Sequence, residues 1–161
     1  MLARPERMAL RVGQKAPDFD VTSSAGQKLK LSDFEGKKNV VLYFYPGDFT
    51  LVCTRETCGF RDSYAELAGN DTEVIGVSVD SDESHQRFAR EYNVPFALVS
   101  DTSKSLSQSY DATGLLGRLM GKTNRVTYVI DKRGYIAGVF DSELRASAHV
   151  DGVRDLVQKL G

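Results

Sequence analysis

The longest uninterrupted apolar run in the chain, residues 40–45, constrains the fold more than any other segment. Its β-branched and aromatic side chains would fall on both faces of a strand, whereas a strand with one face in water alternates apolar with polar residues. The run therefore predicts a central strand that is covered on both sides. It is also far too short to cross a membrane, and Pro46 follows at once to end the strand.

Strand and helix patterns alternate along the rest of the chain. Strands are predicted at 73–79, 96–99, 125–130 and 135–140, and a small hairpin at 19–22 and 28–31. Helical spacing of apolar residues predicts helices at 53–68, 80–92 and 104–110, and a closing helix with a buried stripe of Val150, Val153, Val157 and Leu160. This order predicts an α/β, thioredoxin-like fold, in which a mixed central sheet has helices on both faces and an N-terminal β-hairpin.

Size and charge limit the class of protein. A chain of 161 residues and 17.8 kDa fits a single domain, 1–161, with 1–8 expected to be a loose extension. The formal charge is −1, from 21 Lys and Arg against 22 Asp and Glu, which argues against nucleic-acid binding and against a polybasic membrane anchor. The N-terminal residues lack the apolar core of a secretory signal. We therefore expect a soluble, cytoplasmic protein.

The two cysteines, Cys53 and Cys58, are the candidate reactive groups. A secreted disulfide scaffold would carry more cysteines, so local redox chemistry is favoured over structural cross-linking. Cys53 is predicted on the first turn of the helix after the central strand. Unpaired N–H groups and the positive end of the helix dipole favour a thiolate there, whereas Cys58 lies more than a turn farther and gains little. The pattern predicts that Cys53 is the nucleophile.

The surrounding motif resembles the active-site signature of the peroxiredoxins, the thiol peroxidases. The resemblance rests on Pro46-x-x-x-Thr50-x-x-Cys53, and Cys58-Gly59-Phe60-Arg61-Asp62 five positions on resembles the Q-type branch, also called bacterioferritin comigratory proteins. Residues 12–19 and 125–134 are similar to the opening and the late strand of the family. Leu51-Val52 before Cys53 is more typical of the two-cysteine branch, but no cysteine follows position 58, which excludes the distant resolving cysteine of that branch.

The resemblance implies a reaction. Cys53 would attack a peroxide and become a sulfenic acid, Cys58 would condense with it to a disulfide, and a thioredoxin-like dithiol would reduce the disulfide. Hydrogen peroxide and organic hydroperoxides are the implied substrates, with pocket walls from loops such as 113–123. No cofactor or metal is implied, and a monomer or a homodimer is expected.

Supporting roles come from the same resemblance. Thr50 would supply a hydroxyl, and the backbone of residues 51–53 would supply N–H groups. Arg125 would supply a fixed positive charge, and Pro46 would shield the sulfur from water. Glu56 is similar to the acidic residue that orients arginine in the family. Each residue also has a structural interpretation: Pro46 ends a strand, Thr50 caps a helix, Arg125 is a surface charge and Glu56 favours the helix dipole.

Other interpretations are less favoured. A zinc site would need four ligands at a paired spacing, and a thiol–disulfide oxidoreductase of the thioredoxin type would normally have Cys-x-x-Cys. A redox-sensing or plain binding module on the same fold would not need a cysteine at the mouth of a helix. His85, at helical spacing from Phe88, is interpreted as a packed histidine, and His149 has no partner that the sequence identifies. The acidic run 80–83 is interpreted as a capped helix start rather than a cation site.

Overall fold

The computed structural model describes residues 10–112, 125–141 and 146–160. Its elements, in chain order, are β1 (Asp20–Thr22), β2 (Lys28–Lys30), the 3-10 helix η1 (Leu31–Phe34), β3 (Asn39–Phe44), α1 (Leu51–Gly69), β4 (Thr72–Ser78), α2 (Asp82–Tyr92), β5 (Ala97–Ser100), α3 (Ser105–Ser109), β6 (Val126–Ile130), β7 (Ile136–Phe140) and α5 (Ala146–Leu160). The predicted order of strands and helices is confirmed. The predicted extension 1–8 and the loop 113–123 lie outside the described residues.

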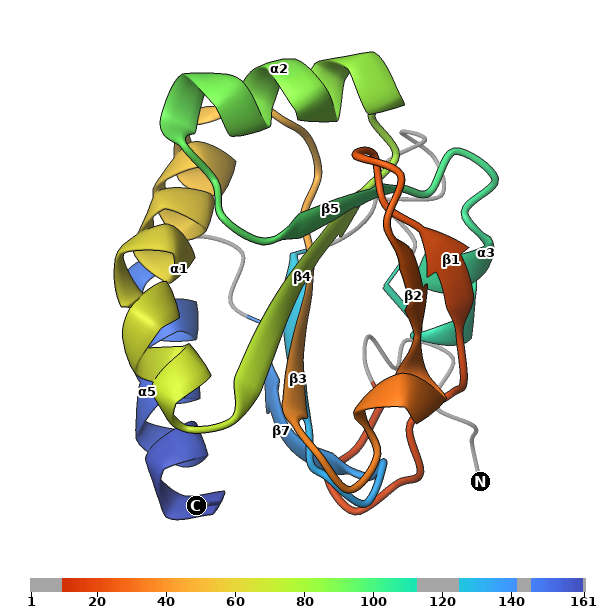
Figure 1. Ribbon diagram of the computed structural model, residues 1–161, viewed down its shortest axis with the longest axis vertical. Coiled ribbons are helices and arrows are strands. Elements are labelled where there is room, and N and C mark those ends of the chain that lie inside the picture. The colour runs from red at the N-terminus through yellow and green to blue at the C-terminus, as the bar shows by residue number, and fades with distance from the viewer. Residues whose placement is uncertain (1–9, 113–124, 142–145, 161) are drawn as a thin grey trace, which may run out of the picture.

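The main sheet has five strands in the order β5-β4-β3-β6-β7 (Figure 1). β4 pairs in parallel with both β3 and β5, whereas β6 is antiparallel to both β3 and β7. β3 is the middle strand, as its apolar run predicts, and all six of its residues are buried. β1 and β2 form the separate antiparallel hairpin.

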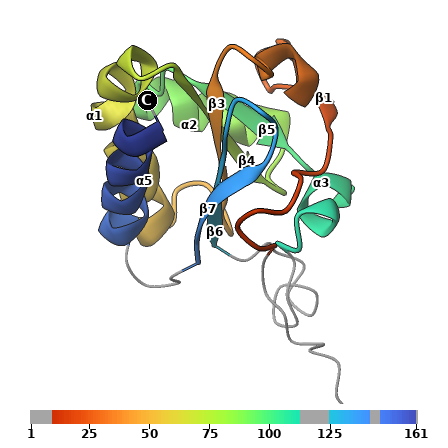
Figure 2. The ribbon, with the colours of Figure 1, turned by 90° about the horizontal axis from the view of Figure 1, so that it is seen from below.

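Side chains of β3 alternate between two hydrophobic cores, one on each face of the sheet. Val40, Leu42 and Phe44 pack with residues of β1–β2, η1 and α3. Val41, Tyr43 and the following Tyr45 pack with residues of α1, α2 and α5. Figure 2, viewed along the layers, shows the hairpin and α3 on one side and α1 with α5 on the other. The thioredoxin-like architecture with a mixed sheet is therefore confirmed.

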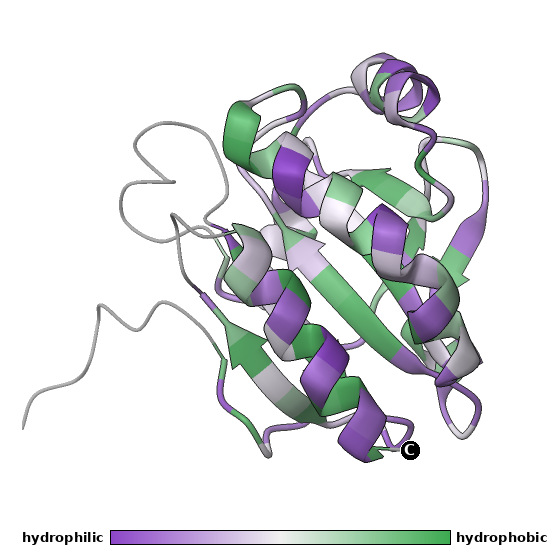
Figure 3. Cartoon of the chain, turned by 90° about the vertical axis from the view of Figure 1, so that its left-hand side faces the viewer, coloured by the Kyte–Doolittle hydropathy of each residue, from purple (hydrophilic) through white to green (hydrophobic). Residues whose placement is uncertain are grey.

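α1 and α5 lie side by side, and small residues allow their close contact. An ideal Cβ placed on Gly59 of α1 would lie 2.8 Å from Val150 Cγ2 of α5, and one on Gly152 of α5 would lie 2.4 Å from Phe140 Cε1. Gly152 lowers helix propensity, but this close approach to β7 requires it. Figure 3 shows hydrophilic residues on the outer surface of both helices and hydrophobic strands behind them. Within the described residues, no helix is long and apolar enough to span a bilayer.

Candidate active site

Cys53 lies at the mouth of α1, directly beyond the carboxyl end of β3. Thr50 is the N-cap residue, and its carbonyl oxygen accepts the backbone N–H of Thr54 at 2.9 Å, so Cys53 lies on the first turn as predicted. The side chain of Cys53 is fully buried and the thiol is free. The first helical turn directs unpaired N–H groups toward this end, where they stabilise negative charge.

The antiparallel pairing of β3 with β6 explains how Arg125 reaches Cys53. Phe44, the last residue of β3, is opposite Val126, the first residue of β6, so the start of β6 lies where α1 begins. Arg125 Nη2 donates to Cys53 Sγ at 3.2 Å, although the two residues are 72 positions apart. Arg125 is only 5% exposed, so the interpretation as a surface charge is wrong.

A buried carboxylate binds the second terminal nitrogen, Nη1, of Arg125. Arg125 Nη1 donates to Glu56 Oε1 at 2.9 Å, and Glu56 is fully buried on the second turn of α1. Burial tends to lower the pKa of Arg125, but the charges of Cys53 and Glu56 and the hydrogen bonds to them outweigh burial and raise it. The guanidinium therefore stays charged while it spans the sulfur and the carboxylate.

Two residues that the sequence left without a role continue this network. Thr127 Oγ1 lies 3.3 Å from Glu56 Oε2 and 2.8 Å from His149 Nδ1, and His149 Nδ1 lies 3.3 Å from Glu56 Oε2. Thr127 lies on β6, two positions after Arg125, which directly precedes the strand, and both side chains contact Glu56 of α1. His149 is fully buried on α5 and precedes Val153 by four positions. The spacing of two residues from Arg125 to Thr127 is typical of one face of a strand, and the spacing of four from His149 to Val153 is typical of one face of a helix. These spacings were the sequence signals that could have placed Thr127 and His149 on buried faces.

Thr50 and Pro46 lie on the loop between β3 and α1. Pro46 is half-buried, and Thr50 is exposed. The Thr50 side chain makes no capping bond to α1, and instead its hydroxyl donates to the carbonyl oxygen of Gly47 at 3.0 Å. Thr50 is therefore the N-cap residue, as its structural interpretation has it, but it caps α1 through its backbone and not through its side chain.

Cys58 lies in the same regular helix as Cys53. It is a half-buried free thiol, and no disulfide joins it to Cys53. Residues five apart in an α-helix are rotated by about 140°, so the two side chains point in different directions. The structure thus describes a form in which both thiols are free.

A second buried polar cluster lies behind the loop. His85 is fully buried, which confirms a packed histidine, and Ser81 caps α2 by accepting the Ser84 N–H at 3.1 Å, which confirms the helix start. One ligand atom each of Asp48, Asp80 and His85 lie within 4.8 Å of one another. Asp48 Oδ2 is 2.7 Å from His85 Nδ1, and Asp80 Oδ2 accepts the Asp48 N–H at 2.8 Å. These atoms are engaged in hydrogen bonds within the protein.

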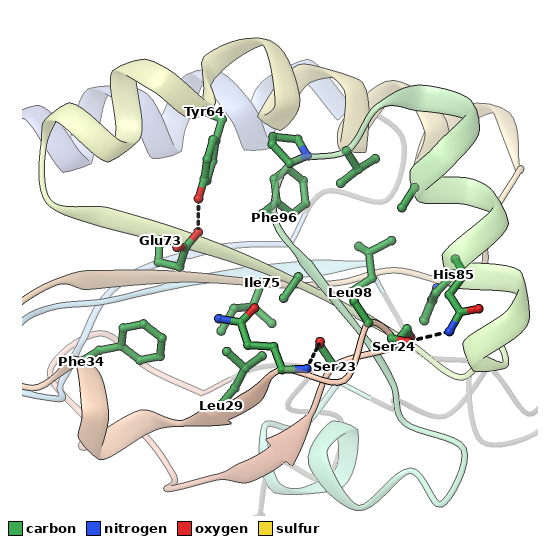
Figure 4. A pocket seen from close by; sticks show the side chains of 17 residues that line it. Ser23, Ser24, Leu29, Phe34, Tyr64, Glu73, Ile75, His85, Phe96 and Leu98 are labelled. Carbon is green, nitrogen blue, oxygen red and sulfur yellow. Dashed lines mark hydrogen bonds between the residues drawn. The ribbon is translucent and has the colours of Figure 1, made fainter.

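A cavity of about 430 Å³ lies apart from the cysteines, between the hairpin, β5 and α2. Figure 4 shows Tyr64 and Glu73 pointing toward one another there, and their hydrogen bond measures 2.8 Å. Neither Cys53 nor Cys58 lines this cavity. A groove of about 520 Å³ between α1 and α5 is lined by Val52 and Arg55, the neighbours of Cys53 in sequence.

Comparisons with known proteins agree with this geometry. Residues 12–139 match the AhpC/TSA family. The chain is 43% identical over 130 residues to peroxiredoxin Bcp of Bacillus subtilis, covering 79% of this chain and 82% of the relative. It is 40% identical over 149 residues to the chloroplastic peroxiredoxin Q of Sedum lineare, covering 92% and 78%. The crystal structure of peroxidoxin BcpB from Mycobacterium tuberculosis superposes with a TM-score of 0.84 at 29% identity, covering 96% of this chain and 99% of that one.

Proposed function

The chain belongs to the AhpC/TSA family and is a peroxiredoxin, a thiol-dependent peroxidase, and we propose that Cys53 is the thiol that reduces the peroxide. The observation that carries the proposal is the 3.2 Å hydrogen bond from Arg125 Nη2 to Cys53 Sγ at a helix N-terminus. Cys58 has no such contact with Arg125 among the described hydrogen bonds. The two thiols therefore differ in their contact with the Arg125 guanidinium.

The reaction begins with attack of the Cys53 thiolate on one oxygen of R–O–O–H. An S–O bond forms while the O–O bond breaks, the leaving alkoxide takes up a proton to become R–OH, and the sulfur becomes a sulfenic acid. Negative charge moves from sulfur to the leaving oxygen during this step. Arg125 remains charged at 3.2 Å from the sulfur, and so stabilises the transition state without reorganisation.

Loop and network residues position the reactants. Because Thr50 donates its hydroxyl proton to Gly47, its oxygen offers lone pairs that accept the O–H of the peroxide. Pro46, half-buried on the loop that follows β3, limits access of water to the sulfur. Glu56 fixes the orientation of Arg125 through the 2.9 Å ion pair. The roles of Thr50 and Glu56 rest on these contacts and on the family motif, and the role of Pro46 rests on the motif.

Cys58 completes the cycle. Its thiol attacks the sulfenic sulfur of Cys53, a disulfide forms and water leaves, and a thioredoxin-like dithiol then reduces the disulfide. We place this cycle in the cytoplasm, because a reducing compartment keeps Cys53 and Cys58 as free thiols before each turnover. We also propose that residues 1–161 act as one catalytic domain, because α5 packs directly on the helix that carries the cysteines. The domain acts as a monomer or a homodimer.

A coupled assay tests the function. Reduced protein with thioredoxin, thioredoxin reductase and NADPH should consume hydrogen peroxide and an alkyl hydroperoxide, and turnover should vanish when Cys53 is replaced by Ser. Insulin reduction by the same protein should be negligible. Peroxide consumption that persists in the Cys53→Ser variant would refute the assignment of the peroxidatic thiol.

A further inference from the structure

The loop that precedes Cys53 has a strained conformation. Phe49, between Asp48 and Thr50, has φ of 65°, in the left-handed region that a bulky side chain rarely adopts. A conformation of this kind persists only where surrounding contacts impose it. The contacts on both sides of Phe49 therefore determine where Thr50 and Pro46 lie relative to the sulfur.

One set of contacts holds the Phe49 ring against α2. Its centroid lies 5.0 Å from that of Phe88 and 6.4 Å from that of Tyr92, with the Arg87 guanidinium 5.4 Å from the ring. Arg87 adds a cation–π contact to the aromatic packing. The loop is thus anchored to α2 on its apolar side.

A second set holds the carboxylate of Asp48. It accepts hydrogen bonds from Tyr45 Oη at 2.7 Å, Ser84 Oγ at 2.8 Å and His85 Nδ1 at 2.7 Å. The other ring nitrogen, His85 Nε2, lies 3.1 Å from the carbonyl oxygen of Val99 in β5. A carboxylate oxygen only accepts, so Nδ1 is the donor to Asp48, while Nε2 also lies 3.4 Å from Ser78 Oγ. His85 therefore connects the loop, through Asp48, to α2 and to β5.

We propose that the buried His85–Asp48 pair is a positioning device for peroxide reduction, acting through the loop rather than on the substrate. Thr50 follows Asp48 by only two residues, and the strained Phe49 lies between them. When Asp48 loses its donor, the backbone at Phe49 is free to relax, and the Thr50 hydroxyl moves away from the sulfur. Displacements of about 1 Å in a reacting geometry lower rates by about 10²-fold. The inference rests on the proposed peroxidase function.

Two substitutions of His85 separate its two contacts. The side-chain amide nitrogen of Asn takes the place of Nδ1, whereas that of Gln takes the place of Nε2. His85→Gln should therefore lose the donor to Asp48 and lower the second-order rate constant with hydrogen peroxide by roughly 10- to 100-fold. His85→Asn should retain that donor and remain within about threefold of wild type.

Alkylation of Cys53 by iodoacetamide, quantified on its peptide by mass spectrometry, is the second readout. This reaction needs the thiolate but not the Thr50 hydroxyl, so His85→Gln should leave its rate unchanged or raise it. Ser81→Ala is the matched control, because it removes the cap of α2 without touching Asp48 and should leave the peroxide rate within about twofold of wild type. If His85→Gln does not fold, Ser84→Ala removes a different donor to Asp48 and should lower the peroxide rate about three- to tenfold.

Several results would overturn the positioning role. The role is wrong if His85→Gln reacts with peroxide at the wild-type rate, if His85→Gln and His85→Asn lose the same fraction of that rate, or if Ser81→Ala loses as much as His85→Gln. It is also wrong if the alkylation rate of Cys53 in His85→Gln falls as far as its peroxide rate. Where Ser84→Ala is tested instead, an unchanged peroxide rate overturns the role. Wild-type protein that does not react with peroxide would instead refute the proposed function, so the two failures are distinguishable.

Discussion

Oxidation of Cys53 and Cys58 to a disulfide is expected to unwind the first part of α1. Both cysteines belong to the helix Leu51–Gly69. Residues five apart in a regular α-helix have Cα atoms roughly 8 to 9 Å apart, whereas a disulfide usually requires about 4.4 to 6.8 Å. The disulfide therefore cannot form until at least one helical turn has opened.

The contacts that unwinding breaks determine the size of the effect. Phe60 is fully buried, with its ring centroid 4.9 Å from that of Tyr43, and exposing such a side chain costs about 1.5–3 kcal/mol. Thr57 Oγ1 and Tyr43 Oη form a 2.9 Å hydrogen bond, and losing it costs about 1 kcal/mol. Together these terms give about 3 kcal/mol, which corresponds to roughly 10²-fold protection of the amides in reduced protein.

Hydrogen exchange measured by mass spectrometry on the two redox forms tests the reasoning. Amides between Cys53 and Arg61 should lose roughly 10²-fold protection on oxidation, while those of β3 and β6 keep theirs. Peroxide-treated Cys58→Ser is the control, because it forms no intramolecular disulfide and should retain protection in α1. Equal protection in both redox forms, with the disulfide confirmed by mass, would refute the argument.

Further predictions concern individual side chains. Cys53→Ser should abolish peroxidase turnover in the coupled assay, because a hydroxyl of high pKa cannot replace the thiolate. Arg125→Ala should lower the rate constant with peroxide by about 10²-fold or more in stopped flow, because the positive charge that stabilises the transition state is lost; an unchanged rate would make Arg125 merely structural. Cys58→Ser should react with a single equivalent of peroxide and accumulate a sulfenic acid that dimedone traps, and absence of an adduct would exclude Cys53 as the site of attack. Burial, and then the hydrogen bond to Glu73, raise the pKa of Tyr64 to about 12. Because the ordinary value is 10.0, the stabilising effect is complete below pH 10 and lost between pH 10 and 12, so chemical denaturation should show a steeper loss of stability there for wild type than for Tyr64→Phe.

Sequence patterns predicted the fold well because each rests on local geometry. The apolar run at 40–45 could only be a strand with both faces covered, and β3 supplies alternate side chains to two cores. The position of Cys53 followed from the strand that ends just before it. Helix bounds were less accurate: α1 begins at Leu51 rather than 53, because the backbone cap at Thr50 leaves no apolar signal.

The partners of Cys53 could not be derived from periodicity alone. Arg125 was identified only by resemblance, because its approach to the sulfur depends on the antiparallel pairing of β3 with β6, a choice of strand order that no local pattern encodes. Once that pairing exists, Thr127 necessarily shares the face of Arg125, since side chains of a strand alternate. His149 then meets Glu56 because α5 packs against α1.

The hydrogen bonds of Asp48 with His85 and Asp80 could not be predicted from local patterns either. Asp48 lies inside the recognised motif, yet its spacing to Cys53 does not indicate that its side chain turns away from the sulfur to His85, 37 positions later. The pattern at 80–83 correctly predicted the start of a helix, but not that Asp80 would accept the backbone N–H of Asp48. Parallel pairing of β4 with β3 creates this contact, because it places the end of β4 beside the end of β3. The proposed peroxidatic cysteine, Cys53, therefore depends on a local motif for its position at the start of α1, and on strand order for the groups that hold the motif in shape.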